Sequence, residues 1–206
     1  MTFLVSTMAG ANGYAQDATG GGVGRTAMVA MARCNIHDRE RETGRVLDLP
    51  LGLEQRKEMA RYSKDSCFPV KGVAYDQVSF RGALFIELLR QRTQAEAAGQ
   101  RGSPLLRPID LDMPVAASDW QSRLILTLLS VAKCVESKNP SGVRYALSWK
   151  TASVEQDEAF DKLRPNMIDC SSSSPELTSN KGALEGALAE VIYRLPAEDR
   201  VFTGVQ

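Results

Sequence analysis

The sequence predicts an α+β fold, in which a small mixed or antiparallel sheet is covered by three to four helices and preceded by a glycine-rich N-terminal arm. Three observations indicate this fold. Residues 143–152 alternate apolar and polar side chains, as a half-buried strand does. Residues 118–132 and the segment that ends near Arg194 instead repeat apolar side chains at helical spacing. Gly20-Gly21-Gly22 lies in a polar stretch that ends the arm.

The predicted boundary between the N-terminal arm and the folded domain lies after residue 24. Residues 1–24 form the predicted arm, with a first strand over Thr2–Met8, and residues 25–206 form a single predicted α+β domain. Small and medium apolar residues fill Arg25–Arg33, which suits a buried helix or an inner strand, and periodicity does not separate these two alternatives.

A charged hairpin is predicted next. The charged cluster His37–Glu42 is followed by Thr43-Gly44, a turn signal, and then by the short apolar stretch Val46–Leu49. In this interpretation the tip of the hairpin projects arginine side chains into solvent.

The remaining elements follow from local patterns. Ser118 and Gln121 match a capping box at the start of the clearest helix, and the serines at 171–174 precede Pro175 at the first position of the last one. The other predicted elements are helices over Leu51–Ser63, Phe80–Ala98 (capped by Ser79) and Val154–Leu163, and a short strand over Leu106–Met113.

The net charge of zero conceals two opposed halves. Residues 24–107 hold fifteen Lys and Arg against ten Asp and Glu, a net charge of +5, whereas residues 108–206 hold ten against fourteen, a net charge of −4. Arginine outnumbers lysine by seventeen to eight, and its planar guanidinium suits phosphates and interface carboxylates. The split predicts either a basic half that meets nucleic acid or an acidic neighbour, or charges that even out on folding.

Cysteine and histidine content excludes several chemistries. The four cysteines contain no C-x-x-C pair, which argues against a compact zinc site, and we expect them to be reduced and mostly buried in a cytoplasmic protein. His37 is the only histidine, so no site that needs two histidines can form. We expect no metal, no cofactor and no membrane span, and the N-terminus lacks the basic region of a signal peptide.

Gly20–Thr26 approximates a phosphate-binding loop. In such loops backbone N–H groups surround the phosphates, a lysine reaches the outer phosphates, and a hydroxyl holds Mg²⁺. Arg25 stands at the lysine position, and Thr19 stands where the motif begins with glycine. A degenerate phosphate-loop protein that binds nucleotides is therefore less favoured than either a nucleic-acid-binding subunit or a structural coat subunit.

The basic hairpin is the best candidate for binding nucleic acid. Alternation along a strand would place Arg39 and Arg41 on one face, where they could contact consecutive phosphates. The predicted nucleic-acid-binding residues are Arg25, Arg33, Arg39, Arg41 and Arg45, and no catalytic residue is predicted.

One family resemblance lies in the same region. Gly24-Arg25-Thr26-Ala27, the small residues up to Arg33, His37-Asp38-Arg39 and Thr43-Gly44 resemble the opening of the N-terminal domain of plasmid mobilisation relaxases. Membership of that family implies a nucleophilic tyrosine and a cluster of metal-binding histidines. This chain has Ala32-Arg33 where the tyrosine is expected and lacks the histidines, so the resemblance implies a non-catalytic relative.

The expected function is that of a non-catalytic subunit of a larger assembly, which binds RNA or single-stranded DNA through its basic N-terminal half and contacts other protein subunits. The alternative is a structural coat or scaffold subunit that makes only protein contacts, with the positive half of one copy against the negative half of the next.

Overall fold

The protein folds into helices, and the computed structural model describes residues 22–37, 39–63, 67, 76–100, 106–108, 110–171 and 180–195. These residues form eight helices and no strand, so the predicted α+β fold with its sheet is wrong for the described part of the chain. The helices are α2 (Gly22–Ile36), α3 (Glu40–Leu47), α4 (Leu53–Tyr62), α5 (Gln77–Ala97), α6 (Trp120–Lys138), α7 (Pro140–Ser148), α8 (Val154–Cys170) and α9 (Lys181–Arg194).

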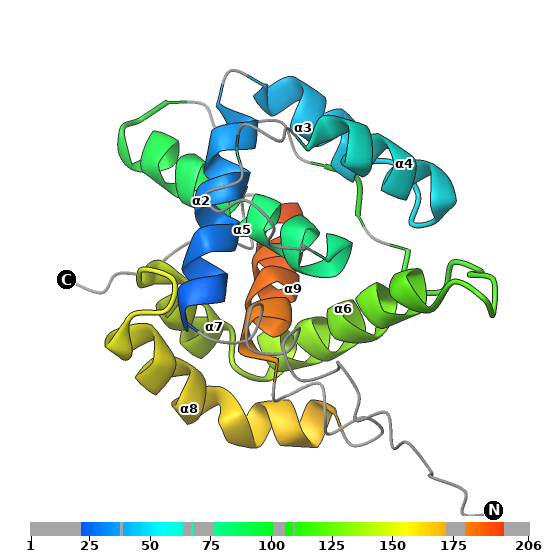
Figure 1. The fold of residues 1–206 in the computed structure, drawn as a ribbon. Coiled ribbons are helices and arrows are strands. Elements are labelled where there is room, and N and C mark those ends of the chain that lie inside the picture. Colours follow the sequence, from blue (N-terminus) through cyan, green and yellow to red (C-terminus); the bar gives the residue numbers. More distant parts are fainter. Residues whose placement is uncertain are drawn as a thin grey trace, which may run out of the picture.

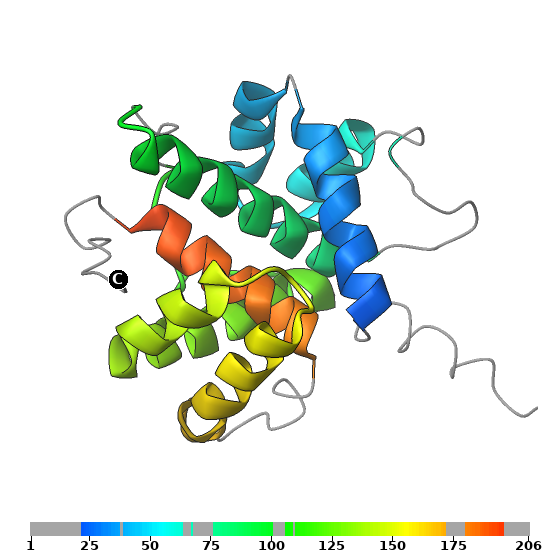
Figure 2. The ribbon, with the colours of Figure 1, turned by 90° about the vertical axis from the view of Figure 1, so that its left-hand side faces the viewer.

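Helices α5 and α9 cross at the centre of the fold, and the other helices surround them (Figures 1 and 2). The two backbones approach closely where Gly82 faces Gly186, since a Cβ atom added to Gly82 would lie 2.9 Å from the Gly186 Cα. Helix α2 packs on α5, α6 packs on α9, and α7 and α8 pack against each other and against α6. Leu84, Phe85 and Leu188 are almost completely buried in the resulting core.

Side-chain caps start most of these helices. The side chains of Asp76, Asp119, Asn139, Ser153 and Asn180 each accept a hydrogen bond from a backbone N–H in the first turn of α5, α6, α7, α8 and α9. Such caps satisfy donors that have no partner within the helix. Two predicted caps are wrong by a few residues, because Asp76 takes the role expected of Ser79 and Asp119 the role expected of Ser118.

The predicted strand over residues 143–152 is helical over most of its length. Asn139 caps α7 and Pro140 occupies its first turn, where a missing N–H costs nothing. Val143 and Ala146 are fully buried while Tyr145 and Trp149 are partly exposed, so burial follows the helical period rather than strict alternation. The alternating pattern arose because the apolar aromatic side chains lie at the surface.

The predicted hairpin is also wrong. Residues 22–36 form a helix, which settles the helix-or-strand alternative for Arg25–Arg33, and α3 follows directly. Thr43 and Gly44, predicted as a turn, lie inside α3, where Thr43, Val46 and Leu47 are buried on one face. The Thr43 hydroxyl donates to the carbonyl of Arg39 at 3.0 Å.

Other predicted boundaries differ as well. Residues 106–108 and 110–113 of the predicted strand Leu106–Met113 form turns and irregular structure, and α8 continues to Cys170, well past the predicted end at Leu163. The predicted strand Thr2–Met8, most of the arm and the serine segment 172–174 with Pro175 lie outside the described residues. Gly22–Gly24, predicted as part of the arm, begin α2.

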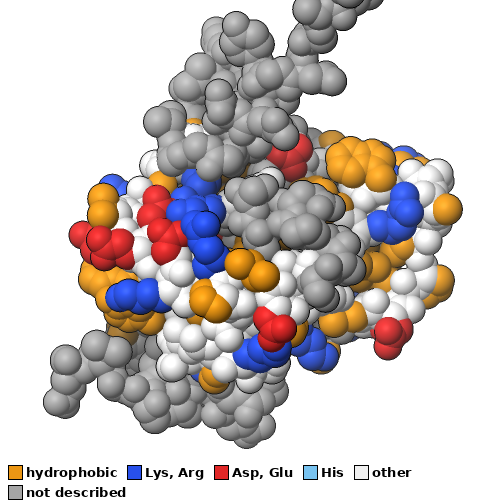
Figure 3. All heavy atoms as spheres, turned by 90° about the horizontal axis from the view of Figure 1, so that it is seen from below, with side chains coloured by type: hydrophobic (Ala, Val, Ile, Leu, Met, Phe, Trp, Pro, Cys, Tyr) orange, Lys and Arg blue, Asp and Glu red, His pale blue; other side chains and the backbone are white. Residues whose placement is uncertain are grey.

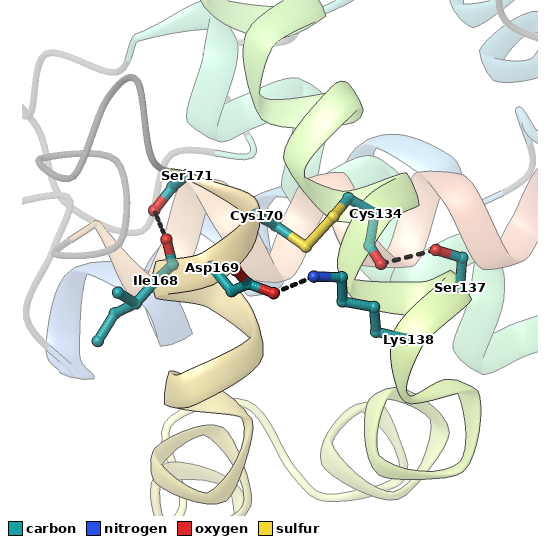
Figure 4. Close-up of a disulfide and its surroundings, with 7 residues drawn as sticks. All are labelled: Cys134, Ser137, Lys138, Ile168, Asp169, Cys170 and Ser171. Carbon is teal, nitrogen blue, oxygen red and sulfur yellow. Dashed lines mark hydrogen bonds and ion pairs between the residues drawn. A yellow bond between two sulfur atoms is a disulfide. The ribbon is translucent and has the colours of Figure 1, made fainter.

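The four cysteines form two disulfides, so the expectation of reduced thiols is wrong. Cys34 on α2 pairs with Cys67, and Cys134 on α6 pairs with Cys170 at the end of α8. The Cα atoms are 5.6 Å and 5.8 Å apart, within the usual range for disulfides. Figure 4 shows that an ion pair between Lys138 and Asp169 lies beside the second disulfide, so two different links join α6 to α8.

None of the helices in the described part of the chain combines the length and apolar character that a membrane crossing requires.

Candidate functional site

The five arginines predicted to bind nucleic acid do not form one surface. Arg25 is 5% exposed and is held in a buried cluster of polar side chains. Its guanidinium lies 3.0 Å from both Glu185 Oε2 and Asp157 Oδ1 and donates to Gln156. A buried guanidinium with this many acceptors ties α2 to α8 and α9, and it cannot also contact a nucleic acid.

This cluster also weakens the phosphate-loop interpretation. Gly20 and Gly21 lie outside the described residues, and Gly22–Thr26 form the first turns of α2. Arg25, at the position of the phosphate-binding lysine, is directed at carboxylates rather than left available for an anion.

Arg39 is engaged in a similar way. Its Nε donates to Glu42 Oε2 at 2.8 Å and its Nη1 donates to the Tyr62 carbonyl at 3.0 Å. The guanidinium carbon lies 4.3 Å from the centre of the Tyr62 ring, a cation–π arrangement. The hydrogen bond to Glu42 raises the pKa of Arg39, and burial raises the pKa of the Tyr62 hydroxyl. These contacts join α3 to α4.

Arg41 and Arg45 are the two predicted residues that remain exposed without an ion pair to any described residue. They lie four residues apart on α3 and therefore on the same side of that helix. Together with Ile36, His37 and Glu40 they line a wide, shallow hollow. His37, the single histidine, is exposed there.

Arg33 instead lies at the edge of a groove between α2, α5, α7 and α9, which we call the α2–α7 groove. The groove has a volume of about 630 Å³, within the range of ligand-binding sites. The buried part of its lining, which we call the floor, comes from α5 and α9 and is mostly apolar. The buried apolar lining residues are Leu89, Ala189 and Ile192, and the half-buried ones are Val29, Ile86 and Leu147.

Four cationic side chains surround this apolar floor. Arg33 comes from α2, Arg90 from α5, Arg144 from α7 and Lys150 from the turn after α7. Lys150 is exposed and forms no ion pair with a described residue. Arg144 lies 3.6 Å from Glu136 on α6. The edge of the groove therefore carries more positive than negative charge.

A single buried carboxylate holds two of these cations. Glu87 is 0% exposed, and its carboxylate accepts hydrogen bonds from Arg90 Nε at 2.9 Å and from Arg33 Nε at 3.3 Å. Burial raises the pKa of Glu87, but the hydrogen bonds from Arg90 and Gln91 outweigh it, so the pKa is lowered. The same hydrogen bond raises the pKa of Arg90. Since two guanidinium groups share one carboxylate, one positive charge is left over.

Glu185 is the carboxylate that lines the groove among the described residues, and its oxygens are occupied. Oε1 accepts hydrogen bonds from Thr151 and Gln156, each at 2.8 Å, and Oε2 faces Arg25 at 3.0 Å. Its negative charge is therefore compensated inside the fold and does not balance the cations at the edge.

An aromatic pair, Tyr145 on α7 and Trp149 directly after this helix, borders the groove. Trp149 lines the groove and is 38% exposed, and its ring packs edge-to-face on that of Tyr145, with centroids 5.7 Å apart. Exposed aromatic side chains next to arginine are common in protein interfaces.

Sequence reasoning missed most of this groove. It placed Arg144 and Lys150 on the polar side of a strand and did not single out Arg90. The signal that could have found the groove is Asn139-Pro140, which marks a helix start. With a helix over these residues, Arg144 and Leu147 share one face.

The charge split along the sequence does not give a surface of one sign on the face formed by α6 and α8. On the face formed by α6 and α8, Figure 3 shows acidic and basic side chains beside one another among hydrophobic ones. In the described part of the chain, no group of three His, Cys, Asp or Glu side chains is arranged to hold a metal ion.

Comparisons with protein-family models, with curated proteins and with solved structures find no match to this chain. The resemblance to relaxases is thus neither supported nor refuted, and it stays a prediction.

Proposed function

We propose that this protein is a non-catalytic binding subunit, which contacts an acidic segment of a partner protein through the α2–α7 groove. The observation that supports this proposal is the combination of an apolar floor with four cations at its edge, one of which, Lys150, has no ion pair with a described residue. Apolar contact supplies affinity, and complementary charge selects the partner and speeds association.

The first test measures binding of an acidic peptide to the groove. The chain has two tryptophans, so a Trp120→Phe variant leaves Trp149 as the only indole and its fluorescence reports directly on the groove. A synthetic peptide rich in leucine and glutamate is titrated into this variant. We expect saturable quenching or a spectral shift, with an affinity that falls as salt rises because exposed charges are screened.

Charge reversal identifies the site. Lys150→Glu in the same background should weaken binding at least tenfold, because a favourable contact becomes a repulsive one. Lys133→Glu is the matched control, since Lys133 is also an exposed lysine without an ion pair to a described residue but lies on α6 outside the groove. Equal weakening by both substitutions would show that the peptide responds only to net charge, and the groove would not be the site.

A second candidate function is nucleic-acid binding through α3. The observation that favours it is the exposed pair Arg41 and Arg45, one helical turn apart. A gel-shift titration with a single-stranded oligonucleotide tests it, and binding through two phosphate contacts should be lost in Arg41→Ala/Arg45→Ala and should weaken with salt. Unchanged affinity in that variant eliminates α3 as a nucleic-acid site.

The disulfides indicate the kind of compartment in which the protein is found. Two disulfides within one chain favour an oxidising compartment over the cytoplasm predicted from the cysteine spacing. Alkylation of the denatured, unreduced protein followed by mass measurement tests this directly. We expect no modified cysteine before reduction and four afterwards. Four modified cysteines before reduction, in protein isolated from its source, would restore the cytoplasmic prediction.

A further inference from the structure

We infer that the segment bound in the α2–α7 groove is a short amphipathic helix, with apolar residues on one face and acidic residues along both sides of that face. This inference rests on the proposed function and specifies the form of the partner.

The walls of the groove are helical faces of matching length. On α2 the lining residues Thr26, Val29, Ala30 and Arg33 span about two helical turns, and on α5 the residues from Ile86 to Gln94 span a little more. Each wall is therefore about 10–12 Å long, which matches two turns of a partner helix and three or four of its side chains.

The chemistry of the floor selects against an extended peptide. Leu89, Ala189 and Ile192 offer no hydrogen-bonding side-chain atoms, and the backbone groups of α5 and α9 at these positions are engaged within their own helices. An extended segment pressed onto this floor would bury amide groups without partners, which is unfavourable. A helix satisfies its own backbone hydrogen bonds and presents only side chains.

The arrangement of the cations fixes where the acidic residues of the partner lie. Arg33 and Arg90 come from α2 and α5, whereas Arg144 and Lys150 come from α7 and the turn after it. The cations thus border the apolar floor from more than one side. A partner with carboxylates only at one end would leave part of this charge unmatched, whereas carboxylates that flank an apolar stripe meet it along its length.

Three probes test the inference in the Trp120→Phe protein. The first is a leucine–glutamate peptide of about 14 residues, or about 21 Å as a helix. The second has the same composition except for two central prolines, which prevent the helix. The third is laurate, a carboxylate on a hydrocarbon chain that also needs no backbone hydrogen bonds. We expect the helical peptide to bind at least tenfold more tightly than the other two.

A variant that fills the groove provides the matching protein-side test. Ala30 is exposed on α2 and lines the groove, so Ala30→Phe should block the helical peptide and weaken its binding at least tenfold without disturbing the core. Ala60→Phe is the control, because Ala60 is exposed on α4, away from the groove. Equal binding by both variants overturns the inference.

The outcomes separate the two proposals. If the proline peptide binds as tightly as the helical one and both depend on Lys150, the partner segment is extended, so the helical inference fails while the proposed function stands. If laurate binds more tightly than either peptide, the groove is a site for hydrocarbon acids and both proposals fail. Absence of binding by all three probes also removes both.

Discussion

The two faces of α5 use arginine in opposite ways. On the inner face Arg81 is 3% exposed, and its Nε donates to Glu190 on α9 at 3.0 Å while its Nη1 donates to Gln55 on α4 at 2.9 Å. On the outer face Arg90 is half-buried and shares Glu87 with Arg33 at the edge of the groove. The guanidinium of Arg81 is paired with a carboxylate and buried. The side chains of Arg90 and Arg33 are also paired, but they remain partly exposed to solvent.

This difference separates stability from binding. A buried ion pair is costly to break, because the remaining group stays charged in a medium that solvates it poorly. Exposed cations contribute little to folding, so they can be kept available for a partner. Arginines close together on one helix can therefore have unrelated roles, and burial distinguishes them.

The largest expected effect is loss of the inner carboxylate. Glu190→Leu leaves Arg81 and Arg194 buried without it, since Arg194 Nε also donates to Glu190 at 3.0 Å. Burial already lowers the pKa of Arg194, an effect that Glu190 opposes. We expect the free energy of unfolding to fall by about 3–5 kcal/mol in denaturant titrations. Glu158→Leu, at an exposed site on α8, should change it by less than about 0.5 kcal/mol.

Loss of a disulfide should have the next largest effect. The Cys134–Cys170 bridge closes a loop across a sequence separation of 36 residues, so Cys134→Ala/Cys170→Ala should lower the free energy of unfolding by about 2–4 kcal/mol. The groove lies mainly on α2, α5, α7 and α9, and peptide binding should be retained while the variant is folded. Loss of binding by a fully folded variant would contradict the separation of stability from binding.

The glycine contact between α5 and α9 tests the closed inner face directly. In Gly186→Ala the new methyl group would collide with the backbone of Gly82, which is not a flexible side-chain end. We expect a loss of about 1–3 kcal/mol in the free energy of unfolding. Gly44→Ala on α3 is the control, because its nearest neighbour would be Leu106 Cδ2 at an ordinary 3.6 Å and alanine favours the helix. Equal destabilisation by both would contradict the close crossing.

The smallest expected effect is a change in the pH dependence of stability, caused by Glu87 beside the groove. The lowered pKa of Glu87 means that its contribution to stability is present above the unfolded-state pKa of about 4.3 and is lost as pH falls through the lower folded-state value. Between about pH 5 and the acid end of the folded range, Glu87→Gln should therefore lose less stability than the native protein. Parallel pH profiles for the two proteins would show that Glu87 is not held ionised by Arg90 and Arg33.

The sequence predicted α4, α5, α6, α8 and α9 as helices, and it missed α3 and α7. The stripe Leu124–Ala132 and the residues from Leu184 to Ile192 lie in α6 and α9, as expected. The strand prediction for the segment after Pro140 was wrong because it treated Tyr145 and Trp149 as core residues, although both are partly exposed. An exposed aromatic side chain breaks the relation between apolar character and burial on which periodicity depends.

The charged residues could not be assigned from the sequence. Arg25 and Arg41 look equivalent along the chain, yet one is buried against Glu185 and the other is exposed. Their fates depend on residues far away in sequence, such as the 160-residue separation between Arg25 and Glu185. Local sequence patterns do not identify ion-pair partners that lie this far away in the sequence.

By itself, the sequence determined that several segments are helical and placed most of their ends to within a few residues, because apolar periodicity acts locally along the chain. It also determined that this chain alone cannot supply two histidines to one site. Only the tertiary structure decided which cysteines pair, which arginines are neutralised and which surround the groove. These properties depend on distances between residues remote in sequence, and packing alone sets those distances.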